Sequence, residues 1–150
     1  MNFDVLQGAG IALLSLGGGV GLQYLVGRKT DERDRRAGFQ RDTLLALQSA
    51  LGDMAMAVER LRAAQHGAAS WAEARAQVPW LDLVEPSVRF RQDRVALDDT
   101  ELRELASAAE AAFRRAISAA SADEFAADYT PTEGLFDLTT ARIGELIRQL

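Results

Sequence analysis

Four carboxylates within seven residues, Asp98, Asp99, Glu101 and Glu104, form the densest group of potentially catalytic side chains in this chain. Paired carboxylates can hold a metal ion or share the acid and base roles of glycoside hydrolysis. This cluster coincides with a predicted helix start, where negative side chains are stabilised by the partial positive charge of the helix N-terminus. We therefore expect these residues to cap a helix rather than to catalyse a reaction.

Other catalytic motifs are missing from the sequence. His66 is the only histidine and there is no cysteine, so the chain has no H-E-x-x-H metal motif and no thiolate nucleophile. We predict no enzyme activity, no metal or cofactor and no small-molecule substrate. An enzymatic or regulatory subunit that uses carboxylate and Arg residues is the alternative. It would need a polar residue on a buried helical face, and no predicted helix offers a clear one.

Two tryptophans and a group of arginines form a candidate partner surface. Trp71 and Trp80 would either fill space in the hydrophobic core or anchor a protein interface. Trp is enriched at such interfaces. Arg89, Arg91 and Arg94 would contact lipid phosphates or pair with nearby carboxylates. Residues 37–150 carry 12 Arg against 18 Asp or Glu, a net charge of −6. Such an acidic region repels phosphate backbones, so we expect no nucleic-acid partner.

An uncharged run near the N-terminus is predicted to attach the region that carries these residues to a membrane. Val5–Gly27 contains no charged residue, and as a helix its 23 residues would rise about 34 Å, enough to cross a bilayer core. Seven glycines in the run are common in membrane spans but costly in soluble helices. We predict a single-pass anchor at residues 1–27 in the lipid bilayer. A cleaved signal peptide, which would release a secreted soluble bundle, and a buried core helix are the alternatives.

A charged juxtamembrane segment at residues 28–36 sets the predicted orientation. Basic residues follow the run and none precedes it, so the positive-inside rule places the N-terminus outside the cell membrane and residues 37–150 in the cytoplasm. The basic residues of this segment are Arg28, Lys29, Arg33, Arg35 and Arg36.

Small residues along the predicted span indicate an association surface. Small-xxx-small faces let two helices approach closely in a membrane, and a glutamine can form a hydrogen bond across the pair. The residues concerned are Gly8, Ala12, Ser15, Gly17, Gly19, Gly21 and Gln23. They favour a homo-oligomer, although such patterns also arise by chance in glycine-rich spans.

The region 37–150 is predicted to be a small antiparallel bundle of three to four helices, which makes the whole chain all-α. Its first helix carries a coiled-coil-like heptad seam with small residues beside it, which favours a compact bundle. The seam consists of Leu44, Leu47, Leu51, Met54, Val58 and Leu61. Pro79 is expected to end a short helix at 71–77. The segment 79–95 is expected to be a structured connection with partly strand-like alternation, and its sequence leaves open whether it is helix or loop.

Later helix starts are marked by capping residues that have a glutamate three positions further on. The four predicted caps are Ser70, Asp98, Ser121 and Thr130. Pro131 follows the last of them at the first helical position, where proline is favoured, so the final helix is predicted at 131–150.

The chain resembles small single-pass membrane-anchored helical proteins of GC-rich bacteria, a group with no known activity. The likeness is carried by residues just after the predicted span: Arg33, Arg36, Phe39, Gln40, Arg41, Thr43, Leu44, Leu47, Gln48 and Leu51. Together with the anchor, it leads us to expect a non-enzymatic scaffold or adaptor that holds a protein partner, or copies of itself, at the cytoplasmic face.

Overall fold

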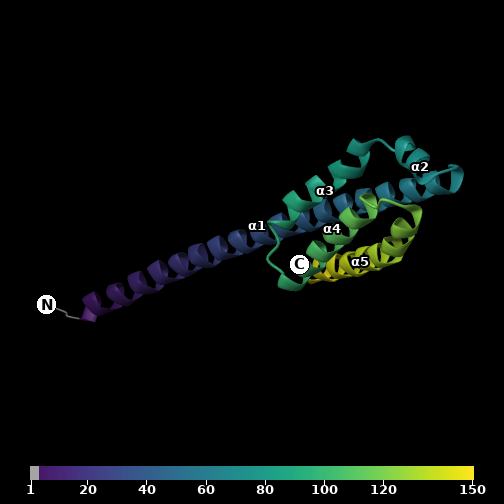
Figure 1. Cartoon of the computed structure of the whole chain (residues 1–150). Coiled ribbons are helices and arrows are strands. Elements are labelled where there is room, and N and C mark those ends of the chain that lie inside the picture. Colours follow the sequence, from purple (N-terminus) through teal and green to yellow (C-terminus); the bar gives the residue numbers. More distant parts are fainter. Residues whose placement is uncertain (1–3) are drawn as a thin grey trace. The chain divides into compact units, whose positions relative to one another are not determined.

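The structure, a computed structural model, describes the backbone of residues 4–150 and the side chains of residues 32–150. Over this range every regular element is an α-helix, as expected (Figure 1). The helices are α1 (Asp4–Gly67), α2 (Trp71–Gln77), α3 (Trp80–Arg94), α4 (Thr100–Ile117) and α5 (Ala122–Gln149). The chain divides into two compact units, Met1–Phe39 and Gln40–Leu150.

The predicted membrane anchor, Val5–Gly27, lies outside the residues whose side chains are described. Among the residues that are described in full, no helix has the length and apolar character needed to span a bilayer. The anchor and its small-residue stripe from Gly8 to Gln23 therefore stay predictions.

Within the unit 40–150, four helices alternate in direction. Arg60 and Asp53 of α1 lie beside Asp82 and Arg89 of α3, at 3.9 and 3.3 Å, so α3 runs antiparallel to α1. Arg115 near the end of α4 pairs with Asp128, and Asp99 at the start of α4 pairs with Arg142, at 3.5 and 2.8 Å, so α5 runs antiparallel to α4. The result is an up-down-up-down bundle, with short α2 joining α1 to α3 at one end (Figure 1).

The predicted heptad seam of the first helix is confirmed. All six of its residues are buried in one core with side chains from the other helices. Phe113 of α4 is fully buried and packs against Phe136 of α5, with ring centroids 6.4 Å apart. Leu150, which follows the end of α5, is exposed.

Two of the predicted helix caps are confirmed. The N–H groups of Glu73 and Glu124 donate to the hydroxyls of Ser70 and Ser121 at 3.3 and 3.2 Å. Each glutamate carboxylate in turn accepts the backbone N–H just before its cap residue, at 2.9 and 2.8 Å. These reciprocal bonds satisfy N–H groups that a helix start leaves unpaired, and they fix the starts of α2 and α5.

The segment 79–95, expected as a structured connection of either helix or loop, is helix α3. Pro79 is its N-cap and Pro86 lies inside it. Leu83, Pro86 and Phe90 recur at helical spacing and are buried on one side of α3. The apparent strand-like alternation around Phe90 reflects two sides of a helix. Burial of these side chains, about 1.5–3 kcal/mol each, offsets the backbone hydrogen bond that Pro86 removes.

The predicted helix start at Thr130 is wrong. The last helix begins at Ala122, so Pro131 lies in its interior rather than at its first position. The preceding turns are held in the core by Phe125 and Tyr129, and the ring of Phe125 lies 5.2 Å from that of Trp71. This packing makes one helix of a segment that the local signals divide into two.

Candidate functional site

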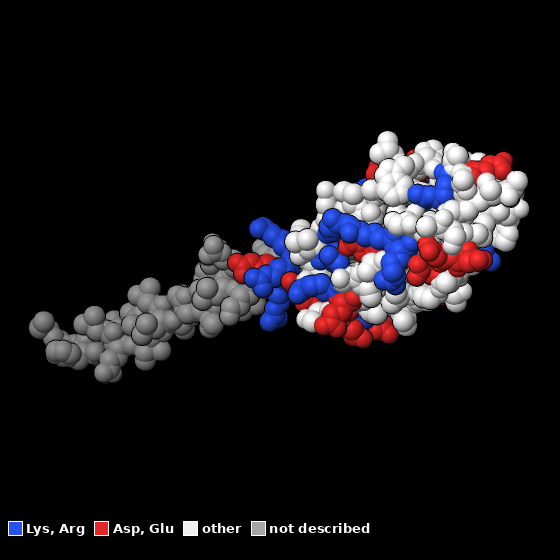
Figure 2. All heavy atoms as spheres, in the orientation of Figure 1, with Lys and Arg blue, Asp and Glu red and all other residues white. Residues whose placement is uncertain are grey.

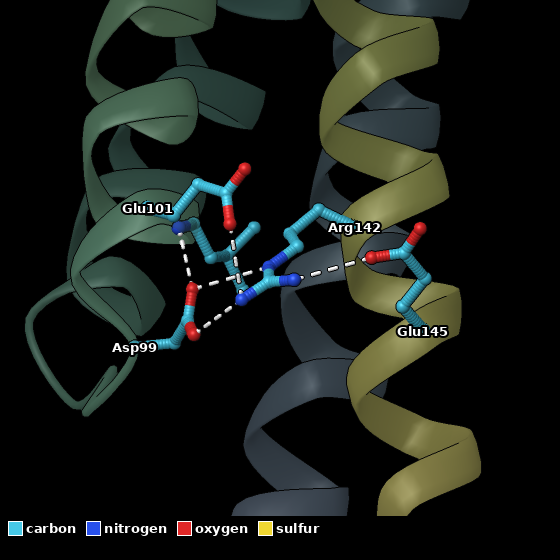
Figure 3. Close-up of polar contacts among 5 residues, drawn as sticks. Asp99, Glu101, Arg142 and Glu145 are labelled. Carbon is cyan, nitrogen blue, oxygen red and sulfur yellow. Dashed lines mark hydrogen bonds and ion pairs between the residues drawn. The ribbon is translucent and has the colours of Figure 1, made fainter.

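The carboxylate cluster is a helix cap joined to an ion-pair network. Asp99 is the N-cap of α4, and its Oδ1 accepts the N–H of Leu102 at 2.7 Å. Arg142 of α5 donates to Asp99 Oδ2 at 2.8 Å and lies 3.1 Å from Glu101 and 3.2 Å from Glu145 (Figure 3). A capping role is confirmed for one member of the cluster, Asp99, which an arginine from another helix also contacts.

The cap residue differs by one position from the prediction. Asp98, the predicted cap, instead accepts a hydrogen bond from Gln40 of α1 at 2.9 Å. Asp99 has the extended backbone of an N-cap, and its side chain reaches Arg142. The hydrogen bond from Arg142, followed by that from the Leu102 N–H, lowers the pKa of Asp99. Asp99 therefore stays ionised, with both of its oxygens engaged.

A buried carboxylate that sequence reasoning missed lies between α3 and α4. Glu110 is almost fully buried, and Arg91 donates two hydrogen bonds to its Oε1, at 2.7 and 2.8 Å. Arg94 lies 3.3 Å from Oε2, and Arg114 lies 3.1 Å from Oε1. Figure 2 shows basic side chains gathered over these two helices. One carboxylate thus holds three arginine side chains in place, and the cluster joins α3 to α4.

The signal for Glu110 was present but weak. It follows Ala109 and precedes Phe113 by three positions, which places it at the margin of the buried face of α4. Arg114 is four positions later, the spacing of a helical ion pair. Only the packing of α3 brings Arg91 and Arg94 to the same carboxylate, because that contact spans 19 residues of sequence.

Tyr129 is the centre of a second polar cluster, between α1 and α5. Arg62 donates to its hydroxyl at 2.7 Å, and Glu133 lies 2.6 Å from the same oxygen. The hydroxyl also contacts the carboxylate of Glu59. Burial and the two carboxylates raise the pKa of Tyr129, so the phenol stays protonated and bonds one carboxylate at a time. The cluster joins two helices and holds no ionised phenolate.

The two predicted tryptophan sites separate in the structure. Trp71 is partly buried, and its indole N–H donates to the carbonyl of Ala119 at 3.0 Å, so it anchors α2 to the end of α4. Trp80, at the start of α3, is 53% exposed, with the guanidinium of Arg75 5.3 Å from its ring centre. Trp71 is therefore a core residue, and Trp80 belongs to the surface.

The main exposed apolar surface on the bundle is one side of α3, which we call the α3 face. It consists of Trp80, Leu81, Val88 and Val95, with Val84 partly buried between them. Leu81 is 75% exposed, Val88 45% and Val95 82%. Val95 is the C-cap of α3 and keeps helical backbone angles, so these three residues, spaced seven positions apart, share one side of the helix. The core packing of Leu83 and Phe90 on the opposite side turns the α3 face outward.

The other predicted site residues are distributed as follows. Arg89 pairs with Asp53 of α1 at 3.3 Å and is not part of the Glu110 cluster. Arg33, Arg35 and Arg36 are exposed, whereas Arg28 and Lys29 lie outside the described side chains. Within residues 32–150, no three His, Cys, Asp or Glu side chains are grouped as metal ligands.

A pocket of 430 Å³ opens at the end of the bundle where α4 begins. Leu97, Leu146 and Leu150 supply much of its apolar lining, and the hydrogen bond between Gln40 and Asp98 lies at its edge. The aspartates along its border already have side-chain partners within the bundle, so the pocket offers mainly an apolar surface.

No protein-family model, curated protein or solved structure matches this chain. The α3 face is the main apolar surface that the folding of the unit 40–150 leaves uncovered.

Proposed function

We propose that this chain is a non-enzymatic, membrane-anchored scaffold or adaptor that presents the α3 face to a protein partner at the cytoplasmic side. The observation that carries the proposal is the line of exposed apolar side chains at Leu81, Val88 and Val95. Full burial of each such side chain contributes about 1.5–3 kcal/mol, so covering the line with a partner would yield appreciable binding energy.

The polar clusters of the bundle support this role over a catalytic one. Asp99 is engaged by the start of α4 and by Arg142, and Glu110 is engaged by three arginines. Catalysis requires groups that act on a substrate, whereas these groups join helices to one another. The bundle is thus suited to hold its surface in a constant shape.

The predicted anchor supports the proposed location of the bundle at the membrane. A tether at Val5–Gly27 would confine the bundle to a layer next to the membrane and raise its effective concentration toward other membrane proteins. Weak binding through one helix face is then sufficient for function.

Photo-crosslinking in cells tests the role of the α3 face. A photoreactive amino acid at Leu81 in the full chain should give covalent protein adducts. The same residue at Leu138, an exposed leucine on α5, is the matched control and should give few. Absence of adducts from Leu81, or equal adducts from Leu138, contradicts the proposed docking role.

Membrane extraction tests the anchor separately. The full chain should stay with membranes in alkaline carbonate. The double substitution Leu13→Arg and Leu14→Arg should release it, because each charge at the centre of a span costs about 2.5–3.5 kcal/mol. Leu45→Arg adds one positive charge at an exposed position of the bundle and should leave extraction unchanged. Release of the unmodified chain would exclude the anchor.

A further inference from the structure

The α3 face has a symmetric layout. Val88 stands midway between Leu81 and Val95, seven residues from each, and the outer two residues are the most exposed apolar side chains of the helix. Seven residues are almost two helical turns, so the three side chains form a straight line about 21 Å long. If a second α3 helix packed on this line in the opposite direction, Leu81 of each helix would face Val95 of the other.

We propose that a second copy of this chain covers the α3 face, with the two α3 helices antiparallel and Val88 on the two-fold axis. This inference rests on the proposed docking role of the α3 face and adds the identity of the partner. A two-fold interface uses the same patch on both copies, so every contact occurs twice.

The charges beside the line fit this antiparallel pairing. Glu85 lies on one flank three residues before Val88, and Gln92 and Arg89 lie on the same flank after it. A two-fold axis at Val88 brings each Glu85 opposite Gln92 and Arg89 of the other copy, because equal flanks face each other in antiparallel helices. The side chains of Glu85 and Arg89 are 67% and 52% exposed, so both remain accessible for contacts across the pair, and Arg89 also pairs with Asp53 of its own chain at 3.3 Å.

The other flank is compatible with the same pairing. Arg91 lies there, and its guanidinium is held against Glu110 of its own chain at 2.7 Å. Parallel pairing would instead place Arg91 beside Arg89 of the second copy, which is repulsive.

The size of the face points to an association that depends on anchoring. One helix face is smaller than the interface of a typical stable dimer, about 800 Å² per partner. Two copies tethered in the same membrane meet at a high effective concentration, which compensates for a small interface. The pairing should therefore be strongest for the full chain in membranes.

Cysteine crosslinking tests the pairing directly, because the chain has no native cysteine. Two helices packed 8–10 Å apart bring facing Cα atoms to about 4–6 Å, which suits a disulfide. The variant Val88→Cys, made as the full chain in membranes, should form a disulfide-linked dimer on mild oxidation. Leu138→Cys on α5 is the control, and it should give about tenfold less dimer.

The direction of pairing is tested by two further variants. Leu81→Cys and Val95→Cys should each give little dimer alone, because each lies about 20 Å from its own counterpart. Co-expression of the two should give a mixed dimer. Strong self-crosslinking of all three variants would mean parallel pairing and overturn the proposed geometry.

Charge reversal provides a test that does not depend on disulfide formation. Glu85→Arg in the Val88→Cys background should lower the dimer yield severalfold, because two arginines then meet at each of the two symmetry-related contacts. Adding Arg89→Glu should restore it. Loss of dimer that the second change does not restore would contradict the contact between Glu85 and Arg89.

The crosslinking and photo-crosslinking results together distinguish failure of self-pairing from failure of the proposed scaffold function. No dimer from Val88→Cys, together with adducts to other proteins from the photoreactive group at Leu81, overturns self-pairing and leaves the scaffold role standing. No dimer and no adducts overturn both.

Discussion

At the scale of single residues, charged side chains in this bundle act by joining helices. Asp99 illustrates this, because one carboxylate caps α4 and also holds Arg142 of α5. The two tasks can be separated by substitution, since asparagine keeps an oxygen for the Leu102 N–H but loses the charge.

We predict that Asp99→Asn lowers the free energy of unfolding by about 1 kcal/mol at neutral pH, and Asp99→Ala by about 2 kcal/mol. Folding lowers the pKa of Asp99, so its charge stabilises the folded chain above the ordinary carboxyl pKa of about 3.9. This contribution is lost as the pH falls through the lowered pKa. Urea unfolding of the full chain in mild detergent at several pH values measures both effects.

The control for this prediction is Asp98→Asn, which changes a neighbouring carboxylate whose hydrogen bond to Gln40 is exposed. It should change stability by less than about 0.5 kcal/mol. A gap between the unmodified chain and Asp99→Asn that persists in strong acid would contradict the ion-pair explanation.

Glu110 is a second residue whose removal should be costly. Glu110→Ala leaves Arg91, Arg94 and Arg114 close together without their common carboxylate, and we expect a loss of about 2 kcal/mol in unfolding free energy. Glu104→Ala, an exposed glutamate on the same helix, is the matched control and should have little effect. Equal effects of the two substitutions in urea unfolding would show that the Glu110 cluster contributes no stability.

At the scale of elements, prolines mark the places where local signals and packing disagree. Pro86 and Pro131 both lie inside helices, although proline normally ends or begins one. In each case large side chains on the same helix, such as Phe90 and Phe125, are buried on both sides of the break. Tertiary burial therefore decides the extent of these two helices.

We predict that Pro131→Ala stabilises the chain by about 1–3 kcal/mol. Pro131 is exposed, so alanine loses no packing, and it restores a backbone hydrogen bond in the interior of α5. Thermal unfolding followed by circular dichroism measures the change. Pro79→Ala, at the N-cap of α3, is the control and should shift stability by less than about 1 kcal/mol. A destabilised Pro131→Ala variant would indicate a helix start at this position.

At the scale of the whole molecule, the unit 40–150 has one hydrophobic core shared by α1, α3, α4 and α5. A single core predicts cooperative unfolding of this unit. The fluorescence of Trp71 reports on unfolding at the end of the bundle that contains α2, because Trp71 packs on Phe125 there. Ala106 is fully buried in α4 and provides a second reporting position.

We predict one unfolding transition for a chain that carries Trp80→Phe and Ala106→Cys. Trp71 fluorescence and the reactivity of the introduced thiol should change at the same urea concentration, because both sites depend on the same core. Trp80→Phe alone, followed by fluorescence, controls for the effect of the cysteine. Two separate midpoints would mean that the α2 end unfolds independently.

Much of this architecture follows from local sequence patterns. The heptad seam from Leu44 to Leu61, the serine caps and the short α2 depend on contacts between residues three or four positions apart, which a helix makes wherever it forms. The charge-free run at Val5–Gly27 likewise predicts an anchor from composition alone.

Other features depended on contacts between distant residues, and these only the folded bundle decides. Arg91 reaches Glu110 and Arg142 reaches Asp99 across 19 and 43 residues, and no spacing rule connects such positions. The α3 face was hidden for the same reason. The side of α3 that faces outward depends on which side α1 and α4 cover, and that is set by burial of Leu83 and Phe90 in a core assembled from four helices.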